Sequence, residues 1–352
     1  MIDASDVIVI GAGQSGLAAA HALRAAGRSP VVLEAGPEPV GSWPSYYDSL
    51  TLFSPARYSS LPGMPFPGDP DRYPRRDEVV DYLRHYAKDL DADIRTGHRV
   101  TSVRRRDGRF TVQVADGAEL TAPVVIAASG AFSTPHRPAL PGLDTFTGTV
   151  LHSADYREPG PFAGQRVIVV GAANTAVQVG YELAKVATVS LATRKPVRYA
   201  PQRPLGRDVH FWSIALGFDH LPIGHLLRNP PHTPVNDDGR YQRAVDAGQP
   251  DQRPVFTHVD GDTVAWPDGT REHVDTILLA TGYRPALSYL DPAERGHHKG
   301  ISTAHPGLGF VGLEWQRSFA SATLRGVGRD ARYVVHRLLR RLTQPITTGQ
   351  GR

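Results

Sequence analysis

The 352-residue chain contains no cysteine. Disulfide bonds, thiolate metal sites and a redox-active cysteine pair are therefore excluded. No run of 18 apolar residues occurs, so we expect no membrane-spanning helix and no membrane partner. No basic segment precedes the first apolar run, so we expect no signal peptide and a cytoplasmic protein.

The sequence also has no large excess of positive or negative side chains. The formal net charge is +4, and the arginines and lysines form no continuous basic tract, so a nucleic-acid partner is not expected. Asp208 and His210 do not form a metal set, and few paired ligands have helical spacing, so no metal site is expected. A hydrophobic content of 40% and this length indicate a globular chain of two domains, as a monomer or a homodimer.

The most informative stretch covers residues 6–34. A buried strand, Val7–Ile10, is followed by a glycine-rich turn, a helix expected over Leu17–Ala26, and a second strand that ends at Glu34. This order is typical of a dinucleotide-binding unit. The residues expected to bind the nucleotide here are Gly11, Gly13, Gln14, Ser15, Gly16, Glu34 and Ala35.

Each part of this motif has a physical role. Gly11 permits the tight turn, Gly13 lets the backbone approach a pyrophosphate, and Gly16 lets the helix pack close to the strand. The helix N-terminus offers free N–H groups and the positive end of a dipole to the phosphates. Glu34 lies 23 residues after Gly11, where a carboxylate accepts hydrogen bonds from ribose hydroxyls.

A long irregular segment, Ala35–Pro74, follows the motif, and loops of this length are usually functional. The sequence then predicts a helix over Asp77–Leu90. Three strands of a meander are expected next, with turns at two Asp-Gly pairs, and a buried strand before Ser129 and Gly130. The meander strands are expected over Val100–Arg104, Arg109–Val114 and Glu119–Ala122, and the buried strand over Val124–Ala127.

The second half repeats this order. Arg166–Arg194 again predicts a strand, a tight turn, a helix and a strand, and Gly171 lies 160 residues after Gly11. Short strands at Val255–His258 and Thr263–Trp266 match the meander, and Asp275–Leu279 runs into Ala280-Thr281-Gly282. A repeat of this size favours two related nucleotide-binding domains.

The two units differ where their nucleotides would differ. Glu34 suits ribose hydroxyls, whereas the corresponding Arg194, followed by Lys195, suits a 2′-phosphate. We therefore expect FAD in the first unit and NADPH in the second. The second fingerprint has alanines at positions 173 and 176 in place of glycines, so a unit that has lost its nucleotide is the alternative.

These observations predict an α/β protein with two Rossmann-like dinucleotide-binding domains, the NADPH domain being inserted into the FAD domain. The FAD domain is expected over residues 1–155 and 285–352. The NADPH domain is expected over 156–284, with an insertion at 203–252 that either shapes the substrate pocket or covers the NADPH. A strand over Phe310–Leu313, a helix ending at Leu342 and a frayed end, Gln344–Arg352, complete the expected FAD domain.

Several motifs resemble the class B flavin-dependent monooxygenases, including their flavin-containing and N-hydroxylating branches and the short bacterial arsenic-resistance-type enzymes. Residues 146–156 resemble the fingerprint FxGxxxHxxx[W/F/Y], with Tyr156 at its last position. Residues 280–283 resemble the ATGY motif, and Gly41-Ser42-Trp43 resembles a GGxW segment beside the flavin. The Baeyer–Villiger branch prefers Trp at the last fingerprint position, which disfavours that reading here.

The resemblance implies an oxidoreductase in which NADPH reduces FAD, O2 forms a C4a-(hydro)peroxyflavin, and one oxygen passes to a small soft nucleophile through N, S or another heteroatom. It implies catalytic roles for Ser54, where relatives often have Asn, and for His152. It extends the cofactor-binding set to Ser42, Trp43, Val100, Ser129, Gly130, Gly171, Asn174, Thr175, Arg194, Lys195, Thr281, Gly282, Tyr283 and Gly312.

Two alternatives remain at this point. The first is an FAD-dependent NADPH oxidase or reductase without oxygen insertion, which Ser54 and the altered second fingerprint would suit. The second is a nucleotide-binding or redox-sensing protein without catalysis.

Overall fold

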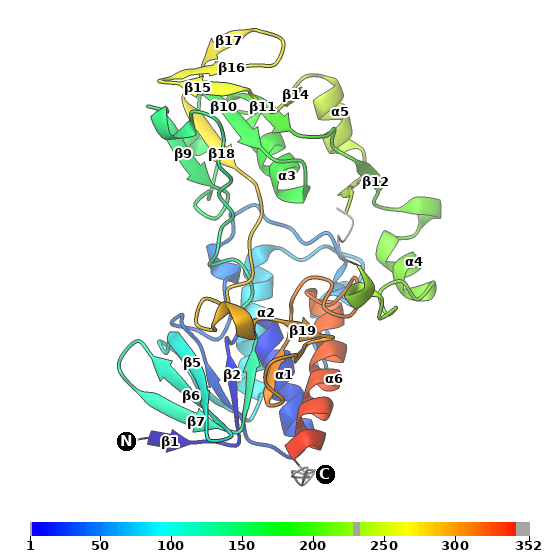
Figure 1. The fold of residues 1–352 in the computed structure, drawn as a ribbon. Coiled ribbons are helices and arrows are strands. Elements are labelled where there is room, and N and C mark those ends of the chain that lie inside the picture. The colour runs from blue at the N-terminus through cyan, green and yellow to red at the C-terminus, as the bar shows by residue number, and fades with distance from the viewer. Residues whose placement is uncertain (1, 228–232, 343–352) are drawn as a thin grey trace.

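The computed structural model describes residues 2–227 and 233–342 and consists of two units, each built on a mainly or wholly parallel sheet (Figure 1). The first unit has a seven-stranded sheet in the order β19-β20-β21-β8-β2-β3-β4. The second has a five-stranded sheet in the order β14-β11-β10-β18-β9. Figure 1 shows the second unit above the first, and the expected α/β architecture with two related units is confirmed.

The first unit alternates apolar residues between two faces of its sheet. Val7 and Val9 of β2 pack on the side of the helices, whereas Ile8 and Ile10 pack on the side of the meander. All four are buried, as expected for a central parallel strand covered on both faces. The elements are β2 Val7–Ile10, α1 Gln14–Ala25, β3 Val31–Leu33, η1 Trp43–Ser45, η2 Ala56–Tyr58, α2 Arg76–Asp89, β4 Asp93–Arg95, β8 Val124–Ala127, η7 Pro292–Glu294, β19 His297–His298, β20 Ile301–Ser302, β21 Leu308–Phe310 and α6 Leu324–Leu342.

The predicted meander is confirmed, with strands β5 Val100–Arg106, β6 Arg109–Val114 and β7 Glu119–Ala122. Asp107 and Gly108 both have positive φ, at 49° and 81°, which accounts for the Asp-Gly turn between β5 and β6. A short strand that the sequence did not reveal, β1 Ile2–Ala4, pairs in parallel with β7.

The second unit repeats this arrangement, as expected. Its sheet also includes β9, which pairs in parallel with β18, so its first strand precedes residue 156. A three-stranded antiparallel sheet takes the place of the meander. The elements are η3 Leu143–Thr145, β9 Thr149–His152, η4 Gly160–Phe162, β10 Arg166–Val170, α3 Asn174–Leu183, β11 Thr188–Thr193, β14 Asp251–Pro254, β15 His258–Asp260, β16 Thr263–Ala265, β17 Arg271–His273 and β18 Thr276–Leu279.

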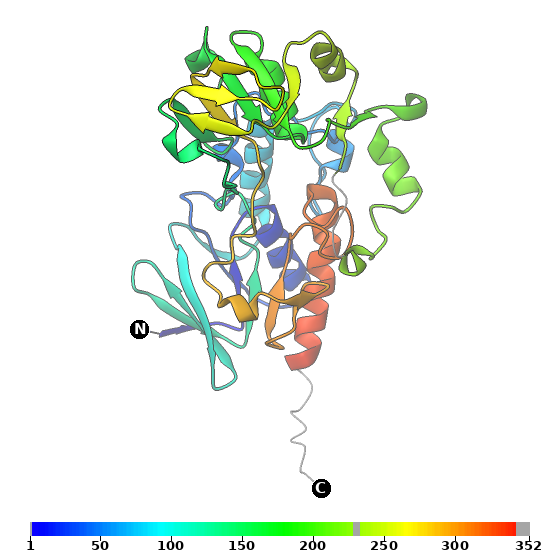
Figure 2. The ribbon, with the colours of Figure 1, turned by 45° about the horizontal axis from the view of Figure 1, so that its top comes forward.

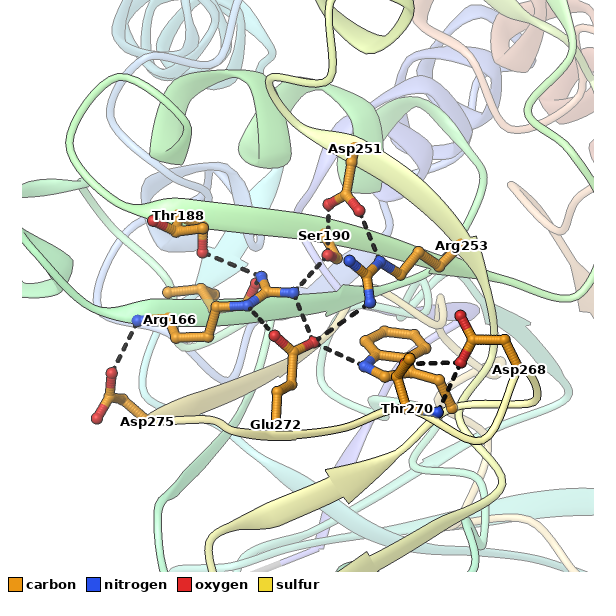
Figure 3. A network of polar contacts seen from close by, with 11 residues as sticks. Arg166, Thr188, Ser190, Asp251, Arg253, Asp268, Thr270, Glu272 and Asp275 are labelled. Atoms are coloured by element: carbon orange, nitrogen blue, oxygen red, sulfur yellow. Dashed lines mark hydrogen bonds and ion pairs between the residues drawn. The ribbon is translucent and has the colours of Figure 1, made fainter.

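A polar network joins the two sheets of the second unit (Figure 3). Arg166, the first residue of β10, donates to both carboxylate oxygens of Glu272 on β17, at 2.9 and 2.8 Å, and to Ser190 on β11, at 2.6 Å. Arg253 of β14 pairs with Asp251 at 2.7 Å and with Glu272 at 3.7 Å. Because Arg166 begins β10, this network is structural and lies away from the turn that follows the strand.

Several boundaries differ from the sequence-based expectation. The strand expected over Phe310–Leu313 lies earlier, because β21 spans Leu308–Phe310. The strand expected over Val255–His258 is wrong, because β14 ends at Pro254 and β15 begins at His258. The intervening residues pass from the parallel sheet, where Val255 N–H donates to Thr193, to the antiparallel sheet, where Thr257 N–H donates to Ala265. Helix α1 starts at Gln14, because extended Gly13 is already its N-cap.

Helix α4 Val209–Ala215, within the 203–252 segment, lies to one side of the two units (Figures 1 and 2). With the preceding β12 Tyr199–Pro201, the elements of this segment are η5 Pro204–Gly206, α4 Val209–Ala215, η6 Gly224–Leu226, β13 Val235–Asp237 and α5 Arg240–Asp246. Among the described helices, none is long and apolar enough to cross a membrane. The expectation for Gln344–Arg352 lies outside the described residues.

Candidate cofactor and substrate site

The turn between β2 and α1 has no room for side chains. Gly11 has φ of +99°, and a Cβ there would lie 2.7 Å from the carbonyl oxygen of Ala128. A Cβ on Gly16 would lie 1.7 Å from the carbonyl oxygen of Gly11, and one on Gly41 would lie 2.7 Å from Cα of Gly13. The turn therefore stays open to a ligand that approaches the backbone closely.

The N-terminus of α1 faces this turn without a side-chain cap. Its first N–H groups are therefore available to an anion. Gly312, near the end of the chain, packs against the N-terminus of α1. A Cβ on Gly312 would lie 2.0 Å from Oγ and 2.7 Å from Cβ of Ser15. Gln14 links two further segments here, donating to Ala322 O at 2.7 Å and accepting from Trp43 Nε1 at 3.2 Å.

Glu34 is buried at the end of β3, with 7% of its surface exposed. Its carboxylate accepts from the N–H of Ala12 at 2.6 Å and of Gly36 at 2.8 Å. These bonds fix the acid beside the glycine turn, where the sequence placed it. Ala35, which follows, is exposed.

The other predicted residues of the first unit lie at its sheet and loops. Ser129 and Gly130 follow β8, and the Ser129 hydroxyl donates to Ala286 O at 2.7 Å. Ser42 is the N-cap of η1, directly before Trp43. Val100 begins β5 and packs against the core on the meander side.

The turn between β10 and α3 corresponds to the first, and a Cβ on Gly171 would lie 2.5 Å from the carbonyl oxygen of Ala280. Gly171 has φ of +151°, compared with +99° at Gly11, and Ala176 fits within the turn with its Cβ fully buried. Helix α3 also lacks a side-chain cap, and the side-chain Oδ1 of Asn174 is buried without a hydrogen-bond partner. Thr175 follows in the first turn of α3.

Arg194 and Lys195 follow β11, at the position that corresponds to Glu34. Both are exposed, and within residues 2–227 and 233–342 neither has a hydrogen bond or an ion pair. Two unpaired cations after β11 and an uncapped helix end after β10 are suited to the phosphates of a nucleotide, and the oxygen of Asn174 is suited to a hydrogen-bond donor such as a hydroxyl.

The remaining predicted site residues lie at the end of β9 and directly after β18. Thr281 donates from its hydroxyl to His136 O at 2.5 Å. His152 is fully buried; its Nε2 bonds Gly282 O at 3.1 Å and its Nδ1 accepts from Ala154 N at 3.1 Å. Burial lowers the pKa of His152, which favours the neutral ring that this pair of bonds requires. Its ring also meets Tyr283 edge-on, with centroids 5.1 Å apart.

Ser54 lies in the long loop of the first unit and is 8% exposed. Its hydroxyl is 2.9 Å from that of Ser59, which itself donates to backbone carbonyls of Ser54 and Pro55. The Ser54 proton is therefore directed towards Ser59 in this arrangement.

The structure reveals one polar pair that the sequence analysis considered only as metal ligands. Asp208 and His210, at the start of α4, form a buried pair with Oδ1 and Nδ1 2.7 Å apart. Asp208 also accepts from Tyr73 at 2.5 Å and from Gln202 at 2.7 Å. Burial would raise the pKa of Asp208, but the bonds from His210, Tyr73 and Gln202 outweigh it and hold the pKa at about 2. Only the short spacing of the two residues could have signalled this pair.

No three His, Asp or Glu side chains in the described part of the chain gather as metal ligands. Each unit has an open turn and a helix N-terminus without a side-chain cap. The next strand is followed by the acid Glu34 in the first unit and by the base Arg194 in the second. These features are typical of an oxidoreductase that uses FAD and a pyridine nucleotide. Comparison with known proteins supports this class.

Residues 8–210 match the model of the pyridine nucleotide-disulphide oxidoreductase family. A protein of Geobacillus kaustophilus described as an uncharacterized oxidoreductase CzcO-like is 31% identical, covering 95% of this chain and 98% of its own. The rice indole-3-pyruvate monooxygenase YUCCA1 is 31% identical, covering 79% and 76%. The structure of the flavin-containing monooxygenase from Stenotrophomonas maltophilia is 32% identical with a TM-score of 0.84, covering 97% and 100%.

The chain belongs to the pyridine nucleotide-disulphide oxidoreductase family and, within it, to the class B flavin monooxygenases. The expected resemblance and the expectation of an oxidoreductase are confirmed. FAD and NADPH, the cofactors expected from the two motifs, are those of this family.

Proposed function

We propose that this protein is an NADPH-dependent monooxygenase that transfers one oxygen atom of O2 to a nitrogen, sulfur or other soft heteroatom of a small molecule. The overall reaction consumes the substrate, O2, NADPH and a proton, and yields the oxidised substrate, NADP⁺ and water. The observation that carries the proposal is the contrast between enclosed Glu34 and exposed Arg194 at equivalent positions of two open nucleotide turns.

In this proposal the first unit holds FAD. The backbone of the turn and the N-terminus of α1 receive the pyrophosphate, while Glu34 receives ribose hydroxyls. Ser42, Trp43, Val100, Ser129, Gly130 and Gly312 surround the rest of the cofactor. Reduced FAD supplies the oxygen chemistry when bound, and the protein orients the reactants and excludes water.

The second unit holds NADPH. The N–H groups at the start of α3 receive its pyrophosphate, and Asn174 Oδ1 gains the hydrogen-bond donor that it lacks. Arg194 and Lys195 bind the 2′-phosphate, which NADH does not have. His152, Thr281, Gly282 and Tyr283 position one unit against the other, and for His152 this positioning role replaces direct proton transfer.

An NADPH oxidase is the second candidate. It is favoured by Ser54, whose hydroxyl is occupied by Ser59 and so is not directed towards a bound reactant. An oxidase would pass the electrons of NADPH to O2 and release hydrogen peroxide without oxidising a second substrate.

The two candidates differ in their products. We would supply the FAD-loaded protein with NADPH, O2 and methyl para-tolyl sulfide, and measure NADPH consumed, sulfoxide formed and peroxide released. Sulfoxide in proportion to NADPH supports the proposal, whereas peroxide in proportion, without sulfoxide, supports the oxidase. Indole-3-pyruvate, after which the rice relative is named, serves as a parallel substrate. Its turnover without any sulfoxide would contradict the heteroatom preference.

A further inference from the structure

Exposed apolar side chains gather in one part of the 203–252 segment. Of the eight large hydrophobic side chains that are exposed among the described residues, six lie within residues 205–226. These six are Leu205, Leu216, Phe218, Leu221, Ile223 and Leu226. Leu216 and Phe218 expose 65% and 58% of their surface. Because monomeric proteins rarely leave a large apolar patch in water, this concentration marks an interaction surface.

The loop that carries these side chains is fixed against α6. Asp219 accepts from the guanidinium of Arg325 on α6 at 2.5 and 3.3 Å, and the two side chains are only 0% and 7% exposed. Gly224 N–H donates to Arg317 O at 2.8 Å, and a Cβ on Gly224 would lie 1.9 Å from Trp315 O. The exposed side chains therefore stand on a segment that the first unit holds in place.

A cavity of about 430 Å³ lies between this loop and α6. Its walls include His220 and Pro222 of the loop and Arg329, Arg332 and His336 of α6. The apolar residues at positions 218 and 221 are chain neighbours of these wall residues. The apolar loop and the basic face of α6 therefore border each other on one surface.

This surface is basic because its acids are withdrawn. Residues 203–227 and α6 contain three acids, Asp208, Asp219 and Asp330. Asp219 and Asp330 are each 2% exposed and paired with an arginine, and Asp208 is bonded to His210. The exposed arginines of these segments that have no carboxylate within ion-pair distance in residues 2–227 and 233–342 include Arg203, Arg207, Arg329 and Arg332.

We propose that the surface formed by residues 216–226 and the exposed face of α6 binds to a bilayer of anionic phospholipids. Phe218 and Leu221 enter the boundary between headgroups and acyl chains, while Arg329 and Arg332 face the lipid phosphates. Binding of this kind needs no spanning helix. The sequence-based expectation of no membrane partner considered spanning segments alone, and the inference is independent of the proposed reaction.

The charge of the surface favours a lipid over a second copy of the chain. In an isologous dimer the same patch occurs on both sides of the interface. The arginines of one copy would then meet a surface whose acids are already buried and paired, and like charges placed together weaken an interface. Lipid phosphates complement both the charge and the neighbouring apolar side chains.

The test is co-sedimentation of the FAD-loaded, full-length protein with lipid vesicles. Vesicles of phosphatidylcholine alone would be compared with vesicles of phosphatidylcholine and phosphatidylglycerol in equal amounts. We expect the partition coefficient to be at least about tenfold higher for the mixed vesicles. Raising the salt from about 0.1 to about 1 M should lower it, because the screening length falls from about 10 to about 3 Å.

Variants on exposed positions separate the two contributions. Phe218→Ser should lower partitioning into mixed vesicles by roughly five- to tenfold. Arg329→Gln combined with Arg332→Gln should lower it by about tenfold or more, since each arginine near an anionic surface contributes a factor of about five. The matched controls, Val186→Ser and Arg271→Gln, change exposed residues of the second unit and should bind as the wild type does.

FAD content and thermal unfolding establish that each variant is folded, and the arginine variant decides the result if Phe218→Ser is not. Failure of the wild type to bind mixed vesicles, or equal losses in the variants and their controls, overturns the inference. Sedimentation velocity without lipid provides the other contradiction. A dimer that Phe218→Ser dissociates, without any binding to vesicles, would assign this surface to a second copy of the chain.

Discussion

Gly312 and Gly117 share a backbone φ of +90° but differ in their surroundings. A Cβ on Gly117 would meet nothing within 4 Å, whereas one on Gly312 would collide with Ser15 at the start of α1. Alanine at either position incurs the same backbone strain of roughly 1–2 kcal/mol. Only at Gly312 does it also disturb the turn between β2 and α1, where we propose that FAD binds.

We therefore expect Gly312→Ala to weaken FAD binding by roughly five- to a hundredfold, from an overpacking cost of about 1–3 kcal/mol. Gly117→Ala should retain wild-type FAD affinity. Both are measured by flavin fluorescence on titrating the apoprotein with FAD. Equal affinities in the two variants would show that Gly312 does not border the cofactor.

Arg194 offers a second prediction at this scale. Arg194→Ala removes a charge-assisted contact to the 2′-phosphate and should raise KM for NADPH by roughly ten- to a hundredfold. KM for NADH should change by less than about threefold, because NADH has no such phosphate. Steady-state kinetics with both nucleotides test this, and equal losses for both would be inconsistent with the proposed role.

At the scale of elements, His152 connects the end of β9 to the segment after β18. His152→Phe leaves Gly282 O and Ala154 N without these bonds and should lower the free energy of unfolding by about 1–3 kcal/mol. Urea unfolding measures this change. A variant of unchanged stability that loses only the pH dependence of turnover would instead assign His152 to proton transfer.

The contact between α4 and the long loop depends on the charge of Asp208. Its pKa is lowered from 3.8 to about 2, so the folded state favours the carboxylate and is stabilised above the unfolded pKa. This contribution is about 2 kcal/mol at neutral pH and is lost as pH falls from about 4 to about 2. Asp208→Asn should therefore be less stable than wild type at neutral pH.

Urea unfolding of both proteins over this pH range tests the sign of the effect. The difference between wild type and Asp208→Asn should shrink as the pH falls through the folded pKa of Asp208. A difference that grows with acidity would contradict the assignment of a charged Asp208 in the folded protein.

The sequence predicted the elements whose signal is local. Glycine spacing and the distance to Glu34 located the first turn, and the Asp-Gly turns located the meander with correct strand starts. Strand β1 was missed because three residues carry too little pattern, and its pairing with β7 is made across the fold. The Asp208–His210 pair was set aside because its meaning depends on Tyr73 and Phe53, which only the tertiary structure brings near.

At the scale of the whole molecule, each of the two related units has an open turn before a helix. The strand after that helix is followed by Glu34 in the first unit and by Arg194 in the second. The chain has no cysteine, so electrons cannot pass through a protein disulfide, as they would in a dithiol enzyme of this fold. Reduction and oxidation must therefore occur between bound cofactors and small molecules. This arrangement agrees with membership in the flavin monooxygenases.

The most direct test of oxygen transfer is isotopic. FAD-loaded protein would be given NADPH, ¹⁸O₂ and methyl para-tolyl sulfide in ordinary water, and the sulfoxide analysed by mass spectrometry. We predict one heavy oxygen atom in each sulfoxide molecule, with catalase present to remove free peroxide. Sulfoxide without the label, or none at all while NADPH is fully consumed, would contradict the assignment of this protein as a heteroatom monooxygenase.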